Sequence, residues 1–170
     1  MPVLIYIFVT LFLFSSANAS TMPTDRLSDC FERLKKKYPP LKSSSYPEGM
    51  PQPTEEDIVA IEKTISGDFR FRDDLRRFLL EVSHLNYKGS EPSRPHGGDA
   101  SVLCNLITAN YNMSKPDLIP FWDDGGGYYC IHHETGNILF FPISADLYEP
   151  DDYGDLVAFL TFKHHLSSGT

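Results

Sequence analysis

The sequence predicts a single α+β domain with N-terminal helices, an antiparallel β-sheet and a closing C-terminal helix. Two patterns predict this architecture. Apolar residues recur at helical spacing up to about residue 86, and short aromatic or β-branched runs separated by turn residues follow. Residues 155–165 then return to helical spacing. Helices followed by a run of strands are typical of an α+β fold, and 170 residues with 41% hydrophobic content suit one domain with its own core.

The amino end reads as an export signal. Residues 3–14 are apolar apart from Thr10, a run too short to cross a bilayer as a helix. Ala17-Asn18-Ala19 has the small-x-small form of a signal-peptidase site. We therefore predict a signal peptide at 1–19 and a secreted or periplasmic product without stable membrane insertion. No Lys or Arg precedes the apolar run, so an uncleaved anchor or a mis-assigned start, which implies a cytoplasmic protein, stays open.

A helix over residues 25–38 is the first predicted element of the mature chain. Thr24 is its expected N-cap, and Pro39-Pro40 should end it, because proline cannot continue a helix. Residues 42–53 are rich in Ser and Pro and predict a linker. We accordingly divide the mature chain into an N-terminal helix with its Pro/Ser-rich linker at 20–52 and a domain at 53–170.

Two further helices are expected before the sheet. Thr54 and Asp57 resemble a capping box, and isoleucines recur at helical spacing after them. Residues 73–86 carry a broad apolar face typical of a helix packed on a core. Residues 87–100 hold Gly, Pro, Ser and His and predict a loop.

Four short runs then predict strands. The first covers 102–107 and the second 118–122, and the third and fourth are joined by a hairpin connection at 134–137. These last two strands cover 128–132 and 138–141.

The formal net charge of −8 is unevenly distributed. Nine acidic residues and no Lys or Arg lie between Asp117 and Asp155, which leaves the rest of the chain at +1. An acidic protein is poorly suited to gripping nucleic acid or an anionic membrane, because both are negatively charged. The charge fits a basic protein partner better.

No sequence motif indicates a catalytic centre, a metal or a cofactor. The Asp123–Gly127 stretch lacks the Gly-Lys-Ser/Thr ending of a phosphate-binding loop and predicts a tight turn. His132 and His133 are adjacent in an expected strand, so their side chains point to opposite faces and do not readily share one ion. A secreted metal-assisted hydrolase that uses His132, His133 and nearby acids remains the alternative enzyme hypothesis.

The three cysteines leave the oxidation state open. Export would permit one disulfide among Cys30, Cys104 and Cys130, with three possible pairings and one thiol left over. Three buried thiols are an equally good interpretation. Asn112-Met113-Ser114 is a glycosylation sequon if the pathway is eukaryotic.

Two blocks of sequence resemble the SUKH superfamily, which is named partly for yeast cell-wall regulators of the Smi/Knr type. The first runs from Thr54 to Glu62 and continues at Asp74–Leu80; the second combines Leu118–Phe121, Asp123–Cys130 and Thr135–Ile138. The resemblance covers about residues 53–166. It implies a non-catalytic protein-binding domain, because bacterial members are mostly immunity proteins that neutralise a toxin and eukaryotic members are signalling or scaffold modules.

We therefore predict an immunity-type protein that binds a basic toxin or nuclease through an acidic surface. An exported eukaryotic scaffold or regulatory domain is a further alternative. The predicted partner-binding residues are the acids around the glycine turn and before the last helix, together with one aromatic anchor: Trp122, Asp123, Asp124, Asp151, Asp152 and Asp155.

Overall fold

The computed structural model confirms an α+β fold. It describes residues 24–66, 68–88, 91–95, 107, 117–142 and 150–166. The helices are α1 (Thr24–Lys37), α2 (Glu55–Ile65), α3 (Asp73–Glu81) and α5 (Leu156–His164). The strands are β1 (Glu91–Pro92), β2 (Leu118–Asp123), β3 (Gly127–His132), β4 (Ile138–Pro142) and β5 (Asp151–Asp152). The predicted signal peptide, Cys104 and the sequon lie outside the described residues.

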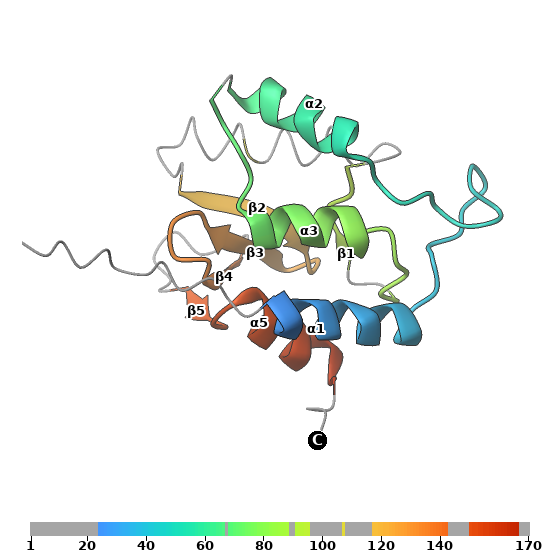
Figure 1. Ribbon diagram of the computed structural model, residues 1–170. Coiled ribbons are helices and arrows are strands. Elements are labelled where there is room, and N and C mark those ends of the chain that lie inside the picture. The colour runs from blue at the N-terminus through green and yellow to red at the C-terminus, as the bar shows by residue number, and fades with distance from the viewer. Residues whose placement is uncertain are drawn as a thin grey trace, which may run out of the picture.

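The five strands form one sheet in the order β1-β2-β3-β4-β5, and every neighbouring pair is antiparallel. In Figure 1, α3 lies across this sheet, α1 and α5 lie side by side below it, and α2 lies above. The predicted hairpin between β3 and β4 is present, since the Gly136 N–H donates to the His132 carbonyl at 2.8 Å. Helices and sheet thus enclose a single aromatic-rich core.

A β-bulge in β2 decides which side chains enter that core. Pro120 pairs with Cys130 and Trp122 with Tyr129, so Phe121 is an extra residue between them. Both Phe121 and Trp122 consequently turn toward the helices, where they are 0% and 1% exposed. Their rings contact Phe78 of α3 and Phe159 of α5 at centroid distances of 5.6–5.8 Å.

The helix predicted at 73–86 ends at Glu81, earlier than its apolar pattern suggests. The reason is tertiary backbone pairing with the segment that follows α1. The His84 carbonyl accepts from the Leu41 N–H, and the Asn86 N–H donates to the Pro39 carbonyl, both at 2.9 Å. These bonds satisfy backbone groups that a longer helix would have used internally, so the last predicted turn is not formed.

The strand predicted at 102–107 is wrong at Ile107, the one described residue of that stretch. Ile107 is helical and fully buried. A short run of apolar residues fits a buried helix as well as a buried strand, so the spacing of its apolar residues does not decide between them.

A buried carboxylate ties α2 to α3. Glu62 is 1% exposed and accepts the Phe71 N–H at 2.9 Å and the Arg76 Nη1 at 2.6 Å. Arg70 Nε lies 3.9 Å from the same carboxylate, and Arg76 also pairs with Glu55. We did not predict this cluster from the sequence, because its members come from two helices and the segment between them.

A second arginine fastens the β3–β4 hairpin to the start of α3. Arg72 Nη1 donates to the carbonyls of His133 and Glu134 at 2.9 and 2.8 Å, and the same guanidinium pairs with Asp74. Gly136 lies against this guanidinium with φ +80°. A Cβ at Gly136 would lie 2.7 Å from Arg72 Nη2.

We expect Gly136→Ala to lower the free energy of unfolding by about 1–2 kcal/mol or more, because a left-handed backbone and a steric contact with Arg72 both oppose a side chain there. Urea unfolding measures the change. Gly126→Ala is the matched control: Gly126 lies in the neighbouring β2–β3 turn, where a Cβ would meet no atom within 4 Å, and should change stability by less than about 0.5 kcal/mol. Equal effects of the two substitutions would contradict both causes, the left-handed backbone of Gly136 and its contact with Arg72.

Candidate functional site

The predicted acidic residues occupy two neighbouring parts of the fold. Asp123 and Asp124 lie at the β2–β3 turn, and Asp151 and Asp152 form β5 at the edge of the sheet. Asp155 follows directly as the N-cap of α5. In the sheet, Asp123 of β2 is paired with Tyr128 of β3, and Asp151 of β5 is paired with Phe140 of β4. Because β3 and β4 lie between β2 and β5, the backbones of the two acids are about three strand spacings, roughly 14 Å, apart.

The two acids of the turn have different surroundings. Asp123 is exposed, and its Oδ1 accepts the Gly125 N–H at 2.7 Å, which holds the turn closed. Asp124 Oδ1 pairs with Lys163 Nζ of α5 at 2.7 Å. Lys163 therefore neutralises part of the predicted acidic surface and anchors the turn to the last helix.

The acids before α5 are also partly engaged. Asp152 accepts the Gly154 N–H at 2.8 Å and the Asn137 Nδ2 at 3.0 Å, and Asp155 caps α5 by accepting the Ala158 N–H at 2.7 Å. Asp151 is exposed, and its backbone pairs with that of Phe140. Asp123, Asp124, Asp151 and Asp152 are all exposed, and Asp124 is paired with Lys163, so the other three are the acids most open to a partner.

Tyr129 links Asp124 of the turn to Tyr153, the residue that follows the acids of β5. Burial, the nearby Asp124 carboxylate and Tyr153 raise the pKa of the Tyr129 phenol, whose hydroxyl bonds to both neighbours. Lys163 Nζ lies 4.5 Å from the centre of the Tyr129 ring, a cation–π distance. The turn, α5 and Tyr153 after β5 therefore share one network.

The structure corrects the predicted role of Trp122. Its side chain is 1% exposed and packs against Tyr87, Phe78 and Phe159, because the bulge turns it inward. A partner cannot reach this indole without opening the core, so Trp122 is a core residue.

The exposed aromatic residue near these acids is Phe162, which the sequence analysis missed. Phe162 is 64% exposed, and its ring lies 5.5 Å from that of Tyr153. Its exposure could have been predicted from helical spacing. Phe162 lies four residues after Ala158 and three before His165, so these three residues share one side of α5, which is exposed. We define the acidic–aromatic surface by its two aromatic residues and the nearby acids: Asp123, Asp124, Asp151, Asp152, Tyr153, Asp155 and Phe162.

The adjacent histidines do not form a metal site with described residues. His132 Nδ1 accepts the Thr135 N–H at 3.3 Å, whereas the His133 ring lies against Phe69 at 5.8 Å. Within the described ranges, no three His, Cys, Asp or Glu side chains are grouped to hold a metal ion. None of the described helices is long and apolar enough to cross a membrane.

Two cysteines can be placed. Cys30 lies buried on α1, on the helical side of the sheet, and Cys130 is buried in β3. Cys130 alternates with the core residues Tyr129 and Ile131 and so faces away from the helices. No disulfide joins Cys30 to Cys130, and Cys104 lies outside the described residues.

Comparison with known protein families identifies the chain. The sequence model of the SUKH_5 family, described as SMI1-KNR4 cell-wall, matches residues 27–162. The chain belongs to this family. The match confirms the SUKH resemblance and begins within α1, so it includes most of the segment 20–52 that the sequence analysis set apart. Leu27, Phe31 and Leu34 of α1 share the core of this SUKH domain. No curated protein matches the chain.

Proposed function

We propose that this SUKH domain is a non-catalytic, immunity-type protein that binds and neutralises a basic toxin through the acidic–aromatic surface. One observation carries the proposal: the exposed Phe162 contacts Tyr153, which directly follows the exposed acids Asp151 and Asp152. Family membership supports a protein-binding role, since the SUKH resemblance implies one.

The two kinds of residue have separate tasks in this proposal. Asp123, Asp151 and Asp152 attract a positively charged partner and accelerate association. Phe162, supported by Tyr153, supplies the apolar contact that slows dissociation. Asp124 and Asp155 mainly hold the surface in shape, through Lys163 and the α5 cap. Export through the 1–19 segment is part of the proposal and places the encounter outside the cytoplasm.

The acidic residues should control the association rate. The partner to test is the protein encoded by the neighbouring gene. We expect Asp123→Asn/Asp151→Asn/Asp152→Asn to slow association with it by about tenfold or more at low salt, because three charges that attract a basic partner are removed. Asn keeps an acceptor oxygen at each position, so the turns remain closed. Stopped-flow or surface plasmon resonance measures the rate at several salt concentrations.

The matched control removes three exposed acids elsewhere, with the same change in net charge: Asp29→Asn/Glu48→Gln/Glu56→Gln. Association should then slow by less than about threefold. In Phe162→Ala, dissociation should accelerate while association stays nearly unchanged. Equal slowing by both triple variants would contradict the acidic–aromatic surface, and the absence of any complex with the neighbouring gene product would contradict toxin neutralisation.

A further inference from the structure

Tyr153 and Phe162, which we call the aromatic pair, meet at the surface between β5 and α5. Phe162 is 64% exposed, and its ring centre lies 5.5 Å from that of Tyr153 with an angle of 47° between the rings. Tyr153 is fixed from the other side by ring contacts with Tyr129 and Phe159, at 5.4 and 6.2 Å. The aromatic pair therefore joins an exposed ring to one that the core holds in place.

The carboxylate of Asp151 projects to the same side of the sheet as the aromatic pair. The Tyr153 N–H donates to the Ile138 carbonyl at 2.9 Å, so the pairing of β5 with β4 continues through this residue. Asp151 and Tyr153 are two residues apart in this extended segment, so their side chains share a face and their Cα atoms lie about 7 Å apart. Asp151 is exposed, and none of the described Lys, Arg or His side chains forms an ion pair with it.

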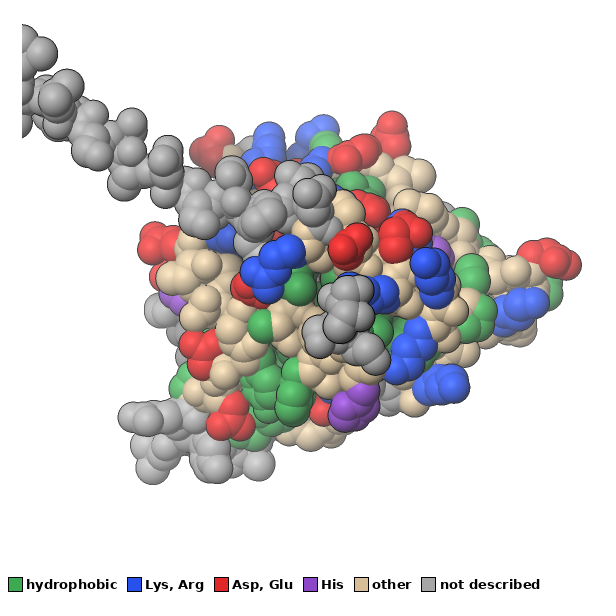
Figure 2. All heavy atoms as spheres, turned by 60° about the horizontal axis from the view of Figure 1, so that its bottom comes forward, with side chains coloured by type: hydrophobic (Ala, Val, Ile, Leu, Met, Phe, Trp, Pro, Cys, Tyr) green, Lys and Arg blue, Asp and Glu red, His purple; other side chains and the backbone are tan. Residues whose placement is uncertain are grey.

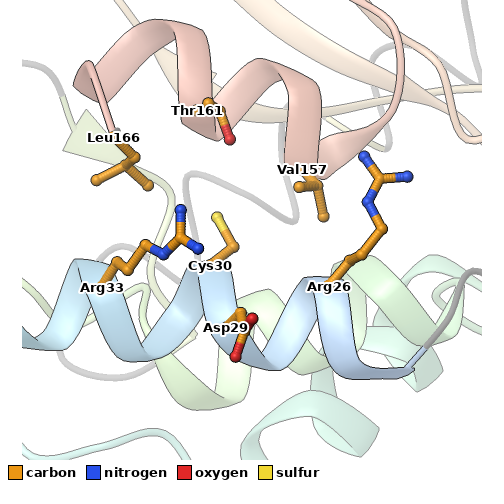
Figure 3. A pocket seen from close by; sticks show the side chains of 7 residues that line it. All are labelled: Arg26, Asp29, Cys30, Arg33, Val157, Thr161 and Leu166. Atoms are coloured by element: carbon orange, nitrogen blue, oxygen red, sulfur yellow. The ribbon is translucent and has the colours of Figure 1, made fainter. Parts of the chain in front are cut away.

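The basic side chains of α1 and α5 are directed elsewhere. Lys163 has a side chain that is only 12% exposed and pairs with Asp124 at 2.7 Å. Figure 2 shows Lys and Arg side chains gathered in the right half of the lower face of the molecule, whereas acidic side chains surround hydrophobic ones at the lower left. In Figure 3, the arginines of α1 extend into the groove that Thr161 faces. Phe162 is the next residue and so projects about 100° further round α5.

We propose that Asp151 and the aromatic pair bind an arginine side chain of the partner. This inference rests on the proposed function and specifies the residue type that the acidic–aromatic surface recognises. A guanidinium is planar, so it can stack on an aromatic ring while its N–H groups donate to both oxygens of a carboxylate. A lysine ammonium has no flat face and is more strongly hydrated, so it gains less from both contacts. The surface consequently prefers arginine to lysine at equal charge.

Two labelled peptides test this preference by fluorescence anisotropy with the purified chain. One carries four arginines separated by Gly-Ser, and the other carries four lysines at the same positions. We expect saturable binding of the arginine peptide and about three- to fivefold weaker binding of the lysine peptide, the size of an exposed cation–π contact. Phe162→Leu keeps an apolar side chain but removes the ring, so the two peptides should then bind within about 1.5-fold of each other.

The carboxylate is tested with a matched pair of variants. Asp151→Asn should weaken binding of the arginine peptide at least threefold, because the bidentate ion pair is lost. Asp29→Asn removes an exposed acid on α1 and should weaken binding by less than about 1.5-fold. Circular dichroism verifies that each variant keeps its fold.

The proposal is overturned by absence of binding, by equal affinity for the two peptides, by an arginine preference that survives Phe162→Leu, or by equal effects of Asp151→Asn and Asp29→Asn. The peptides replace the neighbouring gene product, so this test is separate from that of the proposed function. Arginine-selective binding without a complex with the neighbouring gene product would reject toxin neutralisation alone. A complex with that protein and no arginine preference would reject the arginine site alone.

Discussion

Glu62→Ala should lower the free energy of unfolding by about 2–3 kcal/mol, because it leaves the buried Phe71 N–H without an acceptor and the partly buried Arg76 without its buried counter-charge. Glu62 is 1% exposed and receives two hydrogen bonds, from the Phe71 backbone and the Arg76 guanidinium. Arg76 keeps its second partner, Glu55, but Glu55 is more exposed, so this ion pair stabilises the guanidinium less. Urea unfolding followed by tryptophan fluorescence measures the loss.

Two comparisons identify the cause of that loss. Glu62→Gln keeps an acceptor for the Phe71 N–H but presents no charge to Arg76, so it should be intermediate. Glu56→Gln alters an exposed carboxylate on the same helix and should cost less than about 1 kcal/mol, mostly through the helix dipole. A Glu62→Ala variant as stable as Glu56→Gln would show that the buried ion pair does not hold α2 on α3.

The elements that the sequence predicted well are those specified by local chemistry. The Thr54–Asp57 capping box is formed with both reciprocal hydrogen bonds, and the β3–β4 hairpin lies where its turn residues place it. These features depend on residues a few positions apart in the chain, and a single sequence shows such residues directly.

The elements that it predicted poorly depend on contacts between distant segments. Strict alternation along β2 would have exposed Trp122, and only the bulge, a feature of strand pairing, buries it. The end of α3 depends on Pro39 and Leu41, and the charge of Glu62 is matched by Arg76 from the next helix. Phe162 was identifiable in principle, because it interrupts the exposed side of α5, but its neighbour Tyr153 is known only from the fold.

The buried, aromatic environment of His164 disfavours the charged form of its imidazole. It is 4% exposed, within ring contact of Tyr38, Tyr87 and Trp122, and its Nδ1 lies 3.3 Å from the Tyr38 hydroxyl. Burial lowers its pKa to about 4, and the positive charges of Lys163, Lys37 and His165 act in the same direction. Lys37 also donates to the His164 carbonyl, which holds the end of α5 against α1.

We therefore expect His164 to make the fold acid-sensitive. Between pH 6.5 and about 4, the unfolded chain binds a proton at this histidine and the folded chain does not, so stability falls as pH falls through that window. The shift corresponds to a loss of about 3 kcal/mol, near 1.4 kcal/mol per pKa unit. Burial also lowers the pKa of His84, which adds to the loss with the same sign.

The test is urea unfolding of the wild type, His164→Asn and His165→Asn between pH 7 and 4. Asn retains an acceptor for the Tyr38 hydroxyl at position 164 and suits the left-handed backbone of the exposed His165. His164→Asn should be less stable at pH 7, because a buried side chain becomes smaller, yet should lose about 3 kcal/mol less than the wild type on acidification. His165→Asn should follow the wild-type curve. Parallel curves for the wild type and His164→Asn would mean that the acid sensitivity lies elsewhere, whereas convergence of the two near pH 4 would assign it to this buried histidine.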